Sequence, residues 1–206
     1  GFTHYTSAQY LPPTILDASG DAAGNVWVAG HDGLYLLRPG ADGFQRFTAA
    51  DGLQDYHVLS VAGMGPDEVW VGYEGLFGGL EDNDPEFMLK SGGVDRVKLS
   101  GNVLSSTHYV LGTPPDPNSV DYKNGRYKIR SVYTIRPVLG GAHDGDVWFG
   151  GNHGTAMWNQ GLQETEEHRH CGINGHDPTG DSILMTGDFW GLAFDAAQNV
   201  WIGGAH

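Results

Sequence analysis

The sequence predicts an all-β fold of four-stranded antiparallel sheets, and three observations predict it. A tryptophan-centred segment recurs along the chain. The residues around each copy divide into short strands separated by Gly, Pro and Asp turns. The 33 glycines and 10 prolines among the 206 residues are too many for a helical bundle.

The recurring segment is centred on Trp27, Trp70, Trp148 and Trp201. It reads "GNVWVAGHDGLYLL", then "DEVWVGYEGLFGG", then "GDVWFGGNHGTAMW", and finally "QNVWIGGAH". The tryptophans are 43, 78 and 53 residues apart, so a unit of about 43 residues is expanded in its later copies. A period of this length indicates a repeat architecture.

The elements of one unit follow in a fixed order. A strand at 44–48 leads through the turn "ADGL" to a strand at 58–62, and a Gly/Pro/Asp turn then precedes the Val-Trp-Val strand. A Gly turn and a strand such as "GLYLL" complete the unit. Because one small twisted sheet cannot bury both faces, these units are expected to stack as blades of a β-propeller. The four tryptophans should lie on the second strand of each blade, largely buried between sheets, and glycines should form the tight turns.

The blade units are expected near 14–48, 58–112 and 134–185, with another beginning at 189–206, all in one propeller region spanning 1–206. Insertions are expected near 80–93, 113–126 and 160–182, and residues 94–111 should form a hairpin that closes at 100–102. The opening "FTHYT" aligns with the outer strand "FQRFT". We therefore expect a partial propeller of about four blades from a longer chain. The alternative is a small ring closed by pairing the strand at 2–6 with the strand at 200–203.

The pattern D-x-x-G-N-V-W-V-x-G-x-x-G-L-Y resembles the two-component-regulator-propeller type of repeat. Such repeats occur in periplasmic sensor domains of bacterial hybrid histidine kinases and in secreted or lipid-anchored propeller proteins. The resemblance covers the four tryptophan-centred segments, and the third departs from it because Thr155 and Ala156 replace the Gly-Leu pair. It implies blade architecture and a sensor role.

Charge and composition exclude several classes of protein. The chain has 11 basic and 25 acidic residues, a formal charge of -14, so we exclude nucleic acid as a partner. No stretch approaches the roughly 20 apolar residues that span a bilayer. The single cysteine, Cys171, excludes an internal disulfide framework. Abundant Gly, Asn, Asp and aromatic residues favour a periplasmic or extracellular location.

A binding face is expected where the loops after the tryptophan strands meet the loops that enter the next blade. These loops carry residues that differ between copies while the flanking Trp and Gly persist. They are His31, Tyr73, Glu74, Asn152, His153 and His206. Variation on a fixed scaffold is typical of a ligand face, and unconstrained loop tips vary in the same way.

Two insertions carry metal-binding residue types. His168, His170, Cys171 and His176 bring nitrogen and sulfur donors together, which suits zinc, although the spacing matches no strong zinc signature. Asp82, Asp84 and Glu86 offer oxygen ligands of the kind that calcium takes, without the spacing of a calcium loop. The alternative for both insertions is a solvated loop.

The function expected from the sequence is a non-enzymatic extracytoplasmic β-propeller module that binds a ligand or protein partner in a sensor, surface or assembly protein. The alternative is a metal-assisted lyase or hydrolase whose site on the loop face uses His31, His153 and His206. A third hypothesis is a structural component of an extracellular assembly. The chain has no Gly-x-Ser-x-Gly elbow and no His-Glu-x-x-His pair.

Overall fold

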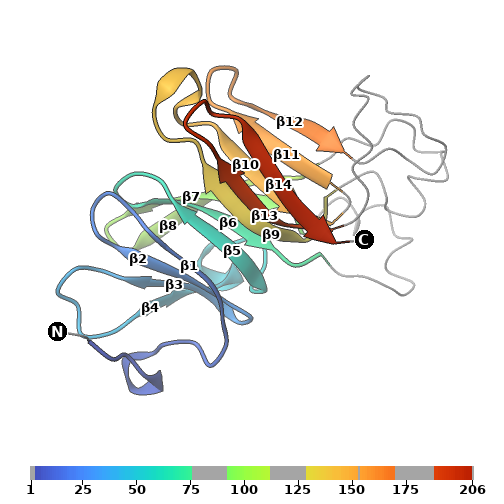
Figure 1. Cartoon of the computed structure of the whole chain (residues 1–206). Helices are drawn as coiled ribbons and strands as arrows, with labels where there is room; N and C mark the ends of the chain where they lie inside the picture. Colours follow the sequence, from blue (N-terminus) through green and yellow to red (C-terminus); the bar gives the residue numbers. More distant parts are fainter. Residues whose placement is uncertain (1–2, 76–91, 112–128, 153, 170–187, 206) are drawn as a thin grey trace, which may run out of the picture.

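The computed structural model describes residues 3–75, 92–111, 129–152, 154–169 and 188–205. These residues form three four-stranded antiparallel sheets and one two-stranded sheet, which follow one another along the chain (Figure 1). The predicted all-β architecture of stacked propeller blades is confirmed.

Each sheet is formed by strands in sequence order, and the second strand carries the recurring tryptophan. The first sheet contains β1 (Ile15–Gly20), β2 (Val26–Gly30), β3 (Gly33–Leu37) and β4 (Gln45–Phe47); the second contains β5 (Val58–Gly63), β6 (Glu68–Tyr73), β7 (Val94–Ser100) and β8 (Val103–Tyr109). The third contains β9 (Val132–Pro137), β10 (Val147–Gly151), β11 (Gly154–Asn159) and β12 (Glu164–Arg169), and the two-stranded sheet contains β13 (Asp188–Phe194) and β14 (Val200–Ala205). Three short 3₁₀ turns are η1 (Ser7–Gln9), η2 (Ala49–Asp51) and η4 (Gly141–His143).

Among the outer strands, the β7–β8 hairpin agrees with the sequence prediction and β12 does not. The β7–β8 hairpin forms as predicted, with Gly101 at a φ of 63° in its tight turn. The segment 164–169 was assigned to an insertion, but it forms β12, the outer strand of the third sheet. Register with β11 decides this, because four of its six residues are charged and give no strand pattern of their own.

The first strands of successive sheets, β1, β5, β9 and β13, contact one another and hold the sheets together. Side chains on these strands bond to the backbone of the neighbouring sheet. The Val61 N–H donates to Asp17 Oδ2 at 3.1 Å, and the Ser60 hydroxyl donates to the Val132 carbonyl at 2.7 Å. These bonds satisfy polar groups that stacking removes from water.

Two apolar cores lie between successive sheets. The core between the first and second sheets contains Trp27, Leu36, Phe47 and Val61, among others. The core between the second and third is built around Trp70, whose ring centroid lies 5.3 Å from that of Phe149. Trp27 and Trp70 therefore each pack against the sheet that follows their own.

Burial of the four strand tryptophans depends on that following sheet. Trp27 and Trp70 are 0% and 1% exposed, as predicted. Trp148 is half-buried, because the sheet after it has only two described strands. The expectation of burial is wrong for Trp201, which is 64% exposed, because no described residue covers its face of β14.

In the second and third sheets, the glycine two positions after the tryptophan leaves room for the next sheet to approach closely, whereas the first sheet has Ala29 at this position. A Cβ on Gly72 would lie 2.9 Å from the Cβ of Val132, and one on Gly150 would lie 3.0 Å from the carbonyl oxygen of Phe189, each in the next sheet. Neither glycine has a positive φ. At the equivalent Gly203 a Cβ would meet nothing within 4 Å, which agrees with the exposure of Trp201.

One aspartate fixes the turn before the tryptophan strand in the first and last sheets. Asp21 accepts hydrogen bonds from the backbone of Ala23 and Asn25, from the Asn25 amide and from Trp27 Nε1 at 3.1 Å. Asp195 accepts the same four bonds, including one from Trp201 Nε1 at 3.2 Å. Partial burial of Asp21 opposes its ionisation, but the hydrogen bonds outweigh burial and lower its pKa. These repeated contacts explain why the pattern D-A-A-x-N-V-W occurs twice in the sequence.

The N-terminal segment repeats the turn that follows the first sheet. In η1 the Thr6 hydroxyl accepts from Ala8 N at 3.2 Å, as the Thr48 hydroxyl accepts from Ala50 N at 3.2 Å in η2. Tyr5 then packs on Phe44 of the first sheet, with ring centroids 5.7 Å apart. The expected strand at 2–6 does not form among residues 3–6, and the described residues show no pairing of this segment with β14, so ring closure by that pairing is not seen.

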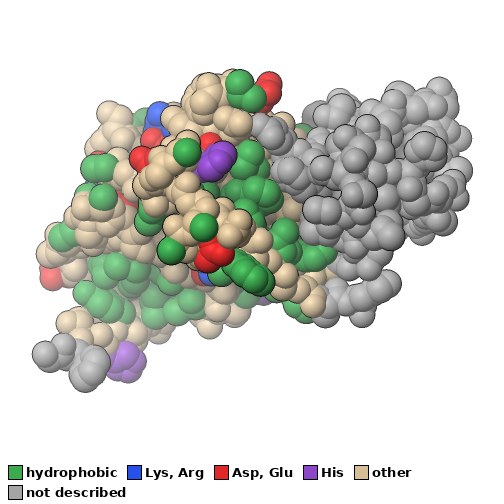
Figure 2. All heavy atoms as spheres, turned by 45° about the horizontal axis from the view of Figure 1, so that its top comes forward, with side chains coloured by type: hydrophobic (Ala, Val, Ile, Leu, Met, Phe, Trp, Pro, Cys, Tyr) green, Lys and Arg blue, Asp and Glu red, His purple; other side chains and the backbone are tan. Residues whose placement is uncertain are grey.

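The surface shows the acidic balance of the sequence. On the face drawn in Figure 2, acidic side chains occur at several places, basic ones at few, and hydrophobic side chains reach the surface in patches. Among the described residues, no helix has the length and apolar character needed to cross a membrane.

Candidate functional site on the loop face

An extra residue interrupts the first strand of every sheet at the same place. In each case the register with the second strand skips one residue, which is the geometry of a β-bulge. The four bulged residues are Leu16, Leu59, Tyr133 and Trp190. Bulges re-aim side chains, and these side chains stand close to the loop face, where the first strands begin.

Two bulged residues form an exposed aromatic pair. The rings of Tyr133 and Trp190, from neighbouring sheets, have centroids 5.8 Å apart at an interplanar angle of 58°. Trp190 is 55% exposed and Tyr133 is half-buried. A large exposed indole held against a second ring offers a flat apolar surface to a ligand.

Carboxylates surround this pair. Burial raises the pKa of Tyr133, and the charge of Asp188 raises it further, as do a hydrogen bond with Asp188 and the charge of Glu74. The Tyr133 phenol is hydrogen-bonded to Asp188, which holds a carboxylate beside the aromatic pair. The site combines two aromatic faces with hydrogen-bond acceptors and a donor, which is a common composition for small-molecule sites.

Two of the residues predicted for the ligand face lie on this surface. Glu74 donates its backbone N–H to the His57 carbonyl at 3.0 Å, and the ring of His57 is 6.2 Å from that of the exposed His31. Together these residues extend the site across all four sheets. We call this group the loop-face cluster: His31, His57, Glu74, Tyr133, Asp188 and Trp190.

Tyr73 was predicted for the ligand face, but the structure places its side chain inside the protein. It is 0% exposed, and its hydroxyl donates to Asp95 Oδ2 at 2.6 Å. Asp95 is also fully buried, and its Oδ1 lies 2.8 Å from His108 Nδ1. Burial, followed by the charge and hydrogen bond of Asp95, raises the pKa of Tyr73 well above its usual range. The side chain of Tyr73 points into the protein from the end of β6, and its hydrogen bond to Asp95 links β6 to β7 in the second sheet.

Asn152 was predicted for the same face and is also buried. Its Oδ1 accepts hydrogen bonds from the backbone N–H groups of Arg130 and Ser131, at 2.8 and 2.6 Å. Its side chain therefore fixes the chain that enters β9 and is turned away from solvent.

The remaining predicted site residues lie outside what the structure describes. His153, His206, His170, Cys171, His176 and the acidic residues Asp82, Asp84 and Glu86 are outside the described ranges. His168 lies in β12, opposite Thr155, and its side chain is not described. Within the described ranges, no group of three or more His, Cys, Asp or Glu side chains could hold a metal ion. The zinc and calcium sites stay predictions.

The aromatic pair was missed at the sequence level, although a signal for it existed. Leu16, Leu59 and Trp190 each stand eleven positions before a strand tryptophan. A fixed distance from the repeat marks a fixed structural position, and in the last unit that position is an exposed indole.

Comparison with known proteins shows the fold. No family model and no curated protein matches the chain. The extracellular domain of BT4673 from B. thetaiotaomicron, described as a hybrid two component system, matches with a TM-score of 0.51 at 12% identity, over 92% of this chain and 26% of that one. The β-propeller domain of Cps50 (Swd1) from Myceliophteria thermophila matches with a TM-score of 0.55 at 10% identity, over 92% of this chain and 50% of that one. YCF48 from Cyanidioschyzon merolae matches with a TM-score of 0.54 at 13% identity, over 93% of this chain and 48% of that one.

The chain has a β-propeller fold. Two solved structures that share this fold are of the extracellular domain of BT4673, described in one as a hybrid two component system and in the other as a one component system. The chain spans about a quarter to a half of the length of the proteins it matches.

Proposed function

We propose that this chain is a non-enzymatic ligand-binding β-propeller module that acts outside the cytoplasm, as part of a sensor, surface or assembly protein. The observation that carries the proposal is the exposed Trp190 held against Tyr133, beside the carboxylates of Asp188 and Glu74. A half-exposed indole on an inner strand is costly to leave in water, and ligand contact would remove it from water.

The location of the protein is supported by two facts. Extracellular domains are among the structures with the same fold, and the chain is strongly acidic with a single cysteine. The catalytic alternative rested on His31, His153 and His206, of which only His31 is described. It stays a prediction.

A partner is also part of this proposal. The Trp201 face of the last sheet has a tryptophan and a glycine at the positions that the second and third sheets turn toward a neighbour, Trp70 with Gly72 and Trp148 with Gly150. We infer that a further propeller blade covers it, with an apolar face like that of the second sheet against Trp27.

The binding proposal is tested with two matched tryptophan variants. Trp190 and Trp201 lie on adjacent strands of one sheet and are 55% and 64% exposed. A panel of mono- and oligosaccharides, amines and amino acids is screened by the rise in thermal midpoint of the wild-type protein, because a ligand of the folded state stabilises it. Trp190→Ala should abolish the rise, and Trp201→Ala should keep it. Loss of the rise in both variants, or in neither, would contradict a site at the aromatic pair.

A further inference from the structure

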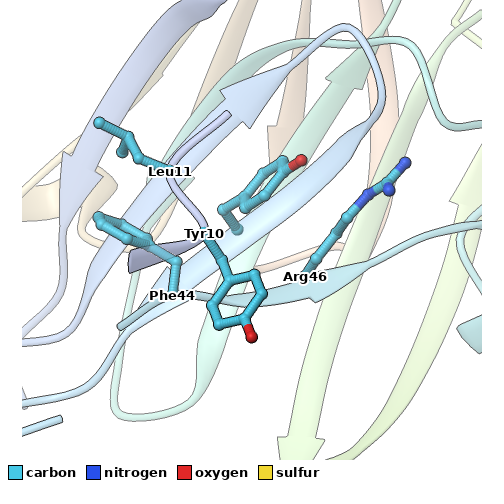
Figure 3. Close-up of a pocket in the computed structure, with 5 residues that line it drawn as sticks. Tyr10, Leu11, Phe44 and Arg46 are labelled. Carbon is cyan, nitrogen blue, oxygen red and sulfur yellow. The ribbon is translucent and has the colours of Figure 1, made fainter. Parts of the chain in front are cut away.

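A pocket opens between the N-terminal segment and the first sheet, apart from the loop-face cluster (Figure 3). It has a volume of about 360 Å³ and is lined by Tyr10, Leu11, Tyr35, Phe44 and Arg46. This volume is at the lower end of the range for small-molecule sites.

The backbone of Tyr10 gives the first reason to regard this pocket as a binding site. Tyr10 ends η1 with a φ of 60° and a ψ of 24°, in the left-handed region. The equivalent residue after η2 is Gly52, with a φ of 111°, which is the residue type that this conformation favours. A tyrosine here is disfavoured by its backbone, and its side chain is 73% exposed, so packing in a core does not explain it.

The floor and walls of the pocket are apolar and aromatic. The side chains of Tyr35 and Phe44 are almost wholly buried, and Leu11 packs against the apolar cluster that contains them. In Figure 3 the ring of Tyr10 lies between the side chains of Phe44 and Arg46. Rings on several sides favour a planar apolar group as the ligand.

Arg46 is the charged residue that lines the pocket, and one side of its guanidinium is paired with Asp32. The Tyr35 hydroxyl lies 2.9 Å from both carboxylate oxygens of Asp32, and Arg46 Nη2 lies 3.3 Å from Asp32 Oδ2. Arg46 also donates from Nε to the Asp32 carbonyl at 2.9 Å. The carboxylate of Asp32 is thus occupied, while no described residue accepts a bond from Arg46 Nη1. Arg46 is about half exposed at the rim and can receive a carboxylate there.

We propose that this pocket binds a small planar aromatic carboxylate, with its ring system against Tyr10, Tyr35 and Phe44 and its carboxylate on Arg46. A cation is disfavoured because the guanidinium already lines the pocket. A purely apolar ligand would displace water from the half-exposed guanidinium of Arg46 and offer it no acceptor.

The test uses 1-naphthylacetate and its neutral amide, 1-naphthylacetamide, measured by isothermal titration calorimetry and saturation-transfer NMR on the same protein. The acid should bind at least about fivefold more tightly than the amide, because only the acid forms a charge-assisted bond with Arg46. Arg46→Gln should bring the two affinities to within about twofold of each other, because the variant has no charge.

Tyr10→Gly is the decisive variant. It introduces the residue that the equivalent turn already has at Gly52, so its thermal midpoint should equal or exceed that of the wild type. Binding of 1-naphthylacetate should nevertheless be lost. Tyr56→Ala, which removes another half-exposed tyrosine, is the matched control and should bind like the wild type.

Two results would overturn the proposal. One is equal binding of acid and amide to the wild type, or no binding of either. The other is unchanged binding by Tyr10→Gly, which would place the probe elsewhere on the protein.

Discussion

Alanine at Trp70 and at Trp201 should have very different effects on stability, although the two residues occupy the same position in their repeats. Trp70 is 1% exposed and packs against the rings of Tyr109, Phe149 and Trp158, with centroids 5.5, 5.3 and 5.6 Å away. Removing a tryptophan from such a core costs about 3–5 kcal/mol, because the surrounding rings cannot fill the cavity.

The cost at Trp201 follows from its exposure. Only about a third of its side chain is out of water. A buried aromatic removes about 150–250 Å² from water at about 25 cal/mol per Å², so a third of that area is worth about 1–2 kcal/mol. The bond from Trp201 Nε1 to Asp195 lies on the surface and adds little.

The measurement is equilibrium unfolding in urea, followed by far-UV circular dichroism because the mutations remove fluorescent residues. The free energy of unfolding should fall by at least about 1 kcal/mol more for Trp70→Ala than for Trp201→Ala, with Trp148→Ala between them. Equal losses for Trp70→Ala and Trp201→Ala would refute the argument that the following sheet, and not the repeat itself, sets the contribution of each tryptophan.

Three further outcomes are expected from the same contacts. Gly72→Ala should lower the free energy of unfolding by about 1–3 kcal/mol, because the new Cβ would meet Ser60 Oγ of its own sheet and lie 2.9 Å from the Cβ of Val132 in the next sheet. Gly203→Ala, with nothing within 4 Å, should change the free energy of unfolding little, and equal effects in urea unfolding would contradict the close-approach argument. Burial and the hydrogen bond with Asp32 raise the pKa of Tyr35 to about 12, whereas it is about 10 in the unfolded chain. The neutral phenol therefore stabilises the folded state fully below a pH of about 10, and this contribution is lost as the pH rises through about 12. In thermal melts across this range, the thermal midpoint of Tyr35→Phe should fall less with rising pH than that of the wild type. The pKa of Asp21 is lowered below 3.8, so the ionised carboxylate stabilises the folded state above that pH and the contribution is lost as the pH falls. Asp21→Asn should be less stable than the wild type at pH 7, and its stability should fall less on acidification. The same dependence of stability on pH in both proteins would refute the role of these hydrogen bonds.

The candidate site was predicted only in part. The position of His31 and Glu74 after the tryptophan strands follows from strand order alone, which places those loops on one face. Whether a side chain there points outward depends on where the strand ends, and β6 continues through Tyr73, which buries that residue against Asp95. The bulges that present Tyr133 and Trp190 are a property of the register between two strands. No single residue encodes such a register.

The N-terminal segment shows the same division. The sequence of this segment resembles the sequence at the end of the first unit, and the equivalent hydrogen bonds of Thr6 and Thr48 confirm that the two turns have the same structure. The position of Tyr10 at a pocket of the first sheet could not be predicted from the sequence, because Phe44 and Arg46, which line the same pocket, are more than thirty residues away.

By itself, the sequence determined most of the local structure of this protein: the repeat, the inner strands with their turns, and the second-strand position of every recurring tryptophan. These features depend on contacts within one sheet, and short-range patterns of Gly, Asp and apolar residues are enough to specify them. The tertiary structure decided which tryptophans are buried, which glycines must lack a Cβ, and which loop residues reach solvent. The physical reason is that burial of a tryptophan and close approach at a glycine depend on a neighbouring sheet. The similar segments around Trp27 and Trp201 therefore differ in burial, because only Trp27 has such a neighbour among the described residues.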